Sequence, residues 1–254
     1  INYPWIDYGW DFGDPPQAWV AWQNLPAWRE QKRNRIVEDF TRFADQGLFA
    51  VRWFVLPDGT NYGTGIESPE NSEGHWQFEP LACEHPCHSK LCDDFEFVLE
   101  TCVRLGLKFV PSLIDFHWCH YGTVADHKAG IVKGGRADIV NDPVKRERFF
   151  EGVLEPLLEV SLRHPEAIYA WELMNEPEWV TTDKTLDEHS PQENKTVPLD
   201  RMLEFLRKGI GRINAKKLPN GQQAFRSTVG FAHHDTLFDW NSANLGVTLH
   251  QFHF

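Results

Sequence analysis

The amino-acid sequence predicts an α/β protein built as a parallel (β/α)8 TIM barrel, of which about six β/α units are present. Strand-like and helix-like segments alternate along the 254 residues, as in a parallel sheet wound by crossover helices. An apolar run that begins at Ile168 ends abruptly in Asn175, Glu176 and Pro177. This pattern is typical of a buried strand with polar residues at its carboxyl end, where TIM barrels keep their functional residues.

Six strands are expected from short apolar runs bounded by turn residues. In chain order they cover residues 1–7, 49–56, 107–114, 168–176, 224–230 and 247–254. The second of them is stopped by Pro57, Asp58 and Gly59, and the third follows Gly106.

The helices between these strands are predicted from apolar residues at helical spacing and from end signals. They are expected at residues 28–46, 92–105, 143–163 and 199–214, with a short helical turn before the sixth strand. In the first helix, Ile36, Phe40 and Phe43 form an apolar stripe. In the third, Asp142 is in the position of an N-cap and Pro143 lies in the first turn.

We interpret residues 1–254 as a single TIM-barrel-type domain that lacks its last two β/α units. The sixth predicted strand would then leave an open sheet edge with unpaired backbone groups. We therefore expect a partner to cover this edge, and a homo-oligomer would do so.

Composition excludes several classes of partner. The formal net charge of −12 would repel a phosphate backbone, and no apolar run approaches the roughly 20 residues needed to span a bilayer, so neither nucleic acid nor membrane is expected. Eleven tryptophans offer flat faces that suit sugar rings, although core packing explains many of them equally well. Because the chain begins with Ile1 instead of Met, we expect a processed product and favour a secreted protein.

A short segment concentrates thiols and imidazoles. It contains Cys83, His85, Cys87, His88 and Cys92. These residues could bind zinc, form a local disulfide or remain free, and the sequence leaves all three alternatives open. None of them makes the chemistry metal-dependent, so no metal ligand is assigned. The glycine-rich stretch 129–135 lacks a nucleotide-binding spacing and is interpreted as a flexible rim loop.

The end of the fourth strand carries the main candidate for chemistry. Pro177 cannot continue the strand, and it favours an extended backbone at Glu176 that would direct this carboxyl group into the space above the barrel. The alternative interpretation is a strand that simply ends in a solvated turn.

The run Trp171-Glu172-Leu173-Met174-Asn175-Glu176-Pro177 resembles glycoside hydrolase family 5 of clan A, most closely its β-mannanase-like members. Weaker similarities lie elsewhere along the chain. Arg52 is placed at the tip of the second strand, His117 and Trp118 follow the third, and His253 lies near the end of the sixth.

The resemblance implies a retaining hydrolase that needs two carboxyl groups and no cofactor. Glu176 would be the general acid/base, and Asn175 would hold the 2-hydroxyl group of the sugar. Arg52 would orient the nucleophile, or else simply form a salt bridge that closes the top of the barrel. His117 and His253 would contact the substrate. Trp179 and Trp118 would stack on sugars, and so would Trp53 unless it packs in the core.

The sequence departs from the family pattern in two places. The nucleophile of the family is a glutamate on strand seven, and no glutamate follows Glu204 in these residues. The family's His-x-Tyr pattern on strand six would use His253 and a position after Phe254, and the alternative, His250 with Phe252, lacks the phenol. We prefer His253 because it lies closer to the end of the strand.

The resulting prediction is a catalytic domain that hydrolyses a β-linked polysaccharide, mannan first and a β-1,4-glucan next, in the manner of a mannanase or cellulase. The alternative is a carbohydrate-binding protein without turnover, which lacks the nucleophile. An unrelated barrel such as an aldolase is disfavoured because no Schiff-base lysine is indicated at a strand end.

Overall fold

The computed structural model describes residues 1–3, 25–57, 86–126, 131–182, 195–241 and 244–253. Its centre is a parallel sheet in the order β1-β2-β5-β8-β9. These strands are β1 (Ala50–Leu56), β2 (Lys108–Asp115), β5 (Trp171–Asn175), β8 (Ser227–Phe231) and β9 (Gln251–Phe252). Asn2 forms a further parallel bridge with Arg52, so the start of the first predicted strand also lies beside the second, while its residues 4–7 lie outside the described part of the chain. The described parts of the six predicted strands therefore meet in sequence order.

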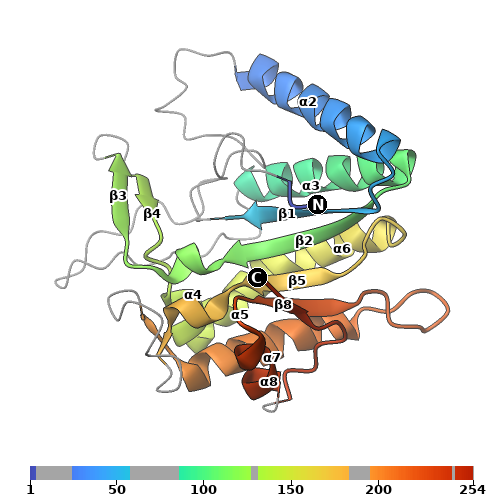
Figure 1. Ribbon diagram of the computed structural model, residues 1–254. Helices are drawn as coiled ribbons and strands as arrows, with labels where there is room; N and C mark the ends of the chain where they lie inside the picture. Colours follow the sequence, from blue (N-terminus) through green and yellow to red (C-terminus); the bar gives the residue numbers. More distant parts are fainter. Residues whose placement is uncertain (4–24, 58–85, 127–130, 183–194, 242–243, 254) are drawn as a thin grey trace.

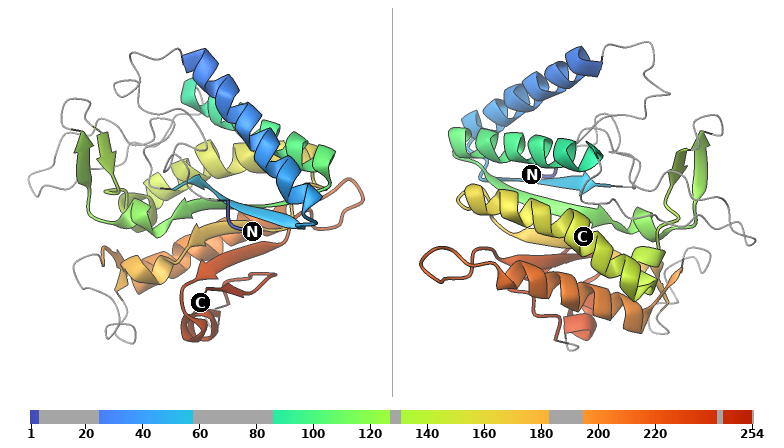
Figure 2. Two further views of the ribbon diagram at one scale, coloured as in Figure 1. Left: turned by 45° about the horizontal axis from the view of Figure 1, so that its top comes forward. Right: turned by 180° about the vertical axis from the view of Figure 1, so that it is seen from behind.

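Helices connect consecutive strands. They are α2 (Leu25–Asp45), α3 (Pro86–Leu105), α4 (Asp138–Asn141), α5 (Pro143–Phe149), α6 (Glu155–Arg163), α7 (Leu199–Ala215) and α8 (His234–Asn241). Figure 1 shows the sheet in the middle of the molecule, and in both views of Figure 2 α3, α6 and α7 run beside one another along one of its faces. This arrangement is the α/β layering of a parallel barrel wall.

Aromatic packing joins these helices to the sheet. Phe95 on α3 lies 5.4 Å from Trp171 on β5 and 6.0 Å from Phe109 on β2, measured between ring centres. Phe150 stacks on Phe205 of α7 at 5.1 Å. All five rings are buried, so β5 is covered on its helix-facing side and its position is fixed by the core.

The predicted helix 143–163 is interrupted. Asp142 caps its start as expected, because its carboxylate accepts hydrogen bonds from the backbone N–H groups of Val144 and Lys145. Between α5 and α6 the π-helical segment η3 (Phe150–Leu154) intervenes. In a regular α-helix the N–H of residue 156 would donate to the carbonyl of Gly152, but Pro156 has no N–H. The missing hydrogen bond explains the wider turn at this point.

Two sequence-based predictions were wrong in detail. The sixth strand is only two residues long, Gln251–Phe252, rather than 247–254. Part of the predicted flexible loop 129–135 is instead β4 (Ile131–Lys133), which pairs antiparallel with β3 (Thr123–Asp126). A further short pair, β6 (Thr181–Thr182) and β7 (Val197–Pro198), was not predicted.

Within the described residues, no helix combines the length and the hydrophobicity that a membrane crossing requires.

Candidate functional site

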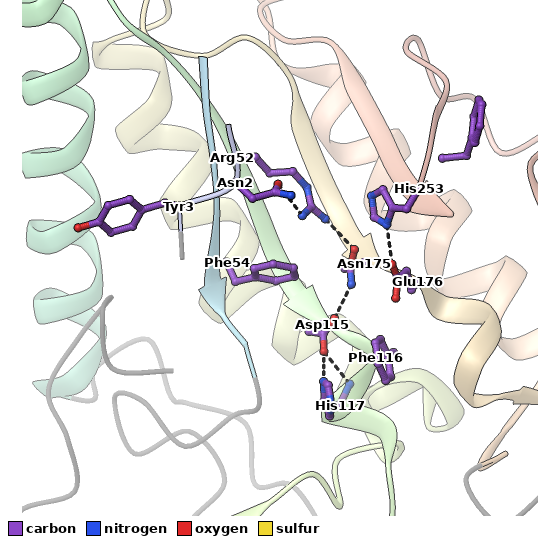
Figure 3. A pocket seen from close by; sticks show the side chains of 11 residues that line it. Asn2, Tyr3, Arg52, Phe54, Asp115, Phe116, His117, Asn175, Glu176 and His253 are labelled. Atoms are coloured by element: carbon purple, nitrogen blue, oxygen red, sulfur yellow. Dashed lines mark hydrogen bonds and ion pairs between the residues drawn. The ribbon is translucent and has the colours of Figure 1, made fainter. Parts of the chain in front are cut away.

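A pocket of about 770 Å³ lies at the carboxyl ends of the strands (Figure 3). Five of the seven predicted site residues line it, namely Arg52, His117, Asn175, Glu176 and His253. The sequence interpretation missed further lining residues, among them Asp115 at the end of β2 and the aromatic Phe54, Phe116 and Phe252. Residues from four strands that are far apart in the sequence thus converge on one cavity.

The backbone at Glu176 differs from the expected extended conformation. Its φ of 47° and ψ of 51° place it in the left-handed region, which costs a side-chain-bearing residue about 1–3 kcal/mol. Its N–H donates to the carbonyl of Gly230 at 2.5 Å, and its own carbonyl accepts from the N–H of Trp179 at 3.2 Å. These bonds hold the turn from β5 into η4 (Pro177–Val180). Tertiary contacts have therefore overridden the local preference that Pro177 imposes.

Two aromatic side chains hold the carboxylate of Glu176. Its Oε1 lies 2.6 Å from Nδ1 of His253, and its Oε2 accepts from the indole N–H of Trp179 at 3.0 Å. His253, and not the exposed His250, is thus the histidine that reaches this carboxyl group. Burial raises the pKa of Glu176, but the contacts with His253 and Trp179 and the charge of Arg52 outweigh it, so the net pKa is lowered.

We expect His253→Ala to raise the pKa of Glu176, since the substitution removes the strongest of the contacts that favour the ionised form. A ¹³C NMR titration of the Glu176 carboxyl carbon measures this directly. Because the folded-state pKa is depressed, the pair stabilises the fold above the unfolded pKa and loses that effect as pH falls through the folded pKa. The loss of stability relative to wild type will therefore be larger at neutral pH than in acid, where Glu176 is protonated in both proteins. An unchanged titration midpoint would contradict the assignment.

Arg52 forms a fork with a carboxylate that was not predicted. Its Nε donates to Oε2 of Glu172 at 2.7 Å, and its Nη2 donates to Oε1 at 2.5 Å. Glu172 is completely buried and also accepts from Ser112 and Gln251, each at 2.8 Å. Arg52 is the third residue of β1 rather than its tip, and its long side chain reaches upward to this site. A glutamate inside an apolar strand was the available sequence signal, because buried charges need partners.

A chain of hydrogen bonds continues from Arg52 across the pocket floor (Figure 3). Nη2 of Arg52 donates to Oδ1 of Asn175 at 2.7 Å, and Nδ2 of Asn175 donates to Oδ1 of Asp115 at 2.6 Å. The other oxygen of Asp115 contacts Nδ1 of His117. Burial raises the pKa of Asp115, and the bonds from His117 and Asn175 offset this effect only in part. The network fixes the amide orientation of Asn175.

Gly230 on β8 has no side chain, and this leaves the space that Glu172 and His253 occupy. A Cβ at this position would lie 2.8 Å from Oε1 of Glu172 and 3.1 Å from a ring carbon of His253. Glu172 cannot yield easily, because four hydrogen bonds hold it. We expect Gly230→Ala to lower the free energy of unfolding by about 1–3 kcal/mol, measured by urea denaturation. Gly211→Ala is the control, since a Cβ there meets nothing.

The three tryptophans proposed for stacking have different positions. Trp118 is fully buried and its indole N–H donates to the carbonyl of Leu56 at 2.5 Å, so it packs in the core and the structure contradicts its assignment to the substrate. Trp53 is also buried, edge-on to Tyr3. Trp179 is partly exposed beside Glu176 and is the one of the three that a ligand could reach.

Of the cysteines proposed to bind zinc, form a disulfide or remain free, the structure describes the side chain of one. Cys92 carries a free thiol, and the side chains of Cys83 and Cys87 lie outside the described part of the chain. Elsewhere, Glu96, Glu100 and His164 bring potential ligand atoms together. The carboxylate of Glu96 is already bound by Arg163 at 2.8 Å and by His164 at 3.3 Å, so these residues form an ion-pair cluster.

Searches with protein-family models and among curated proteins found no match. Solved structures are similar. A β-1,4-mannanase from the sea hare Aplysia kurodai superposes with a TM-score of 0.60 at 18% identity, over 93% of this chain and 61% of the mannanase. For the β-mannanase of the blue mussel Mytilus edulis the TM-score is 0.63 at 14% identity, over 98% and 67%. For a β-1,4-D-mannanase from Cryptopygus antarcticus it is 0.62 at 16% identity, over 100% and 66%.

These likenesses confirm the predicted fold class. The similar structures are TIM-barrel enzymes, and this chain has the same α/β architecture with a parallel sheet. It spans between 61% and 67% of the length of those three proteins, in agreement with about six of the eight barrel units. At identities below one fifth, the comparison establishes the fold and leaves the chemistry to be argued from the pocket.

Proposed function

We propose that this protein is a glycoside hydrolase that cleaves β-linked polysaccharide, with mannan as the first candidate and a β-1,4-glucan as the second. The observation that carries the proposal is the position of Glu176. Its carboxyl group lies in a pocket at the carboxyl end of a parallel strand, with Asn175 before it and His253 in contact with it. Charged and amide groups that converge in an aromatic-lined cavity suit the hydroxyl groups and apolar faces of a sugar.

Each residue takes a distinct role in this proposal. Glu176 donates a proton to the leaving glycosidic oxygen and later removes one from the attacking water. The Asn175 side chain donates one amide hydrogen to Asp115 and accepts a hydrogen bond from Arg52. Its second amide hydrogen and the other lone pair of its oxygen hold the 2-hydroxyl group. Arg52 provides positive charge from below, and Trp179 presents an aromatic face beside the reacting bond.

The proposed retaining reaction also needs a carboxylate nucleophile, about 5–5.5 Å from the acid/base. Among the described pocket residues the other acid is Asp115, which is engaged by His117 and Asn175. We therefore propose that the nucleophile is a carboxylate outside the described pocket residues, from elsewhere in the protein or from a second subunit. A negative charge placed there would raise the lowered pKa of Glu176 toward the value that a general acid requires.

The second candidate function is carbohydrate binding without turnover. The lowered pKa of Glu176 favours it, because an ionised carboxylate can accept hydrogen bonds from sugar hydroxyls but has no proton to donate.

The test is the release of reducing sugar from β-mannan and from carboxymethyl-cellulose by the full natural chain. Preferential release from mannan is expected, with the β-anomer as the first product in ¹H NMR. Release from neither polymer, together with mannohexaose binding by calorimetry, would instead establish the binding function. Inertness in both measurements would refute both proposals.

A further inference from the structure

A second glutamate lies two residues beyond Glu176 and takes no part in the proposed reaction. Glu178 belongs to η4, and only 3% of it is exposed. Its Oε1 accepts hydrogen bonds from two consecutive backbone N–H groups, of Ala232 at 2.6 Å and of His233 at 3.2 Å. Its Oε2 is buried and has no hydrogen-bond partner among the described residues. Such an arrangement is unusual for a carboxyl group, since burial without full pairing is costly.

The contacts of Glu178 join the turn after β5 to the carboxyl end of β8. Gly230, Ala232 and His233 form one side of this junction, and each faces η4. Gly230 accepts from the N–H of Glu176 at 2.5 Å, and the ring of His233 lies 5.5 Å from that of Trp179, edge to face. Glu178 links the two sides of this junction through its bonds to Ala232 and His233, and we call this pair of bonds the clamp.

We propose that Glu178 is a positioning residue for Glu176: by binding the backbone of Ala232 and His233, it holds the left-handed turn in which the Glu176 carboxylate meets Trp179 and His253. The left-handed backbone at Glu176 is strained and persists only where surrounding contacts impose it. The position of the carboxyl group depends on this dihedral, because Cβ of Glu176 moves with the backbone. Without the clamp, the turn relaxes and the carboxylate leaves its two partners.

The ionisation behaviour of Glu178 agrees with this role. Burial raises its pKa, and although the backbone N–H groups lower it, the net value is about 7. The side chain is therefore largely protonated below neutral pH. Glutamine matches the neutral form in shape, and its amide oxygen can accept the same two bonds. Glu178→Gln should thus preserve the clamp, whereas Glu178→Ala removes it.

The indole N–H of Trp179 offers a direct readout, because it donates to Oε2 of Glu176. Its ¹H–¹⁵N signal is assigned by its loss in Trp179→Phe, and Glu176→Gln gives the position of the signal without the charged acceptor. We expect Glu178→Ala to move the signal more than halfway toward that position, and Glu178→Gln to leave it near the wild-type value. Should Glu178→Ala fail to fold, Glu178→Asp replaces it, since the shorter side chain cannot reach both backbone groups.

A kinetic readout follows for the active enzyme and rests on the proposed function. We expect Glu178→Ala to lower kcat on mannohexaose by about 100-fold, as a misplaced catalytic group does, with rescue by Glu178→Gln. A lower melting temperature with an unmoved indole signal would overturn the positioning role. A wild-type protein that turns over neither polymer would refute the hydrolase proposal, while the indole signal would still decide the role of Glu178.

Discussion

Glu176→Gln will lower kcat on β-mannan by about 10²- to 10⁴-fold, the usual contribution of a positioned general acid/base. The substitution keeps the size and shape of the side chain but removes the group that delivers and accepts the proton. Its amide oxygen can still accept the bond from the Trp179 indole, so the pocket keeps its form and KM will change little. The measurement is the initial rate of reducing-sugar release over a range of mannan concentrations.

The matched control is Glu166→Gln. Glu166 is exposed and lies in the loop before β5, at the opposite end of the strand from the pocket. The same chemical change there should leave kcat unaltered. If Glu176→Gln retained more than about a tenth of wild-type kcat, Glu176 could not supply the acid/base step. Aryl mannosides with good leaving groups extend the test, because they need little protonation and will be cleaved by the variant at rates closer to wild type.

The strand order and the position of Glu176 could be predicted because both depend on local signals. Alternating apolar runs and turn residues mark the strands, and parallel strands present their carboxyl ends at one edge. The left-handed backbone of Glu176 could not be predicted in the same way. It results from bonds to Gly230 and from the clamp by Glu178, which join residues more than fifty positions apart. Local preference before a proline favours a different conformation.

The roles of buried polar and aromatic residues were equally beyond local reasoning. Trp118 follows a strand among polar neighbours and resembles a rim residue in sequence, yet it is buried between Leu56 and Phe149. Glu172 resembles one residue of a motif, yet it is the partner of Arg52, which is 120 positions away along the chain. Both outcomes depend on which strands become neighbours. The sequence pattern predicts the order of the strands in the sheet, but it does not predict which side chains of neighbouring strands contact each other.

Glu172→Ala will lower the free energy of unfolding by about 3–5 kcal/mol, the typical loss when one partner of a buried ion pair is removed. The reason is the state in which it leaves Arg52. This guanidinium is only 13% exposed, and it would keep its charge with Asn2 and Asn175 as its other hydrogen-bond partners among the described residues. Ser112 and Gln251 would lose their acceptor as well. Urea denaturation followed by tryptophan fluorescence measures the change.

The double variant Arg52→Met/Glu172→Leu separates the cost of an unpaired charge from the worth of the pair. Apolar residues of similar volume commonly replace a buried ion pair at little cost. We therefore expect the double variant to be more stable than Glu172→Ala, although it will still disturb Asn175. Equal destabilisation in both would mean that the stranded charge of Arg52 does not account for the loss in Glu172→Ala.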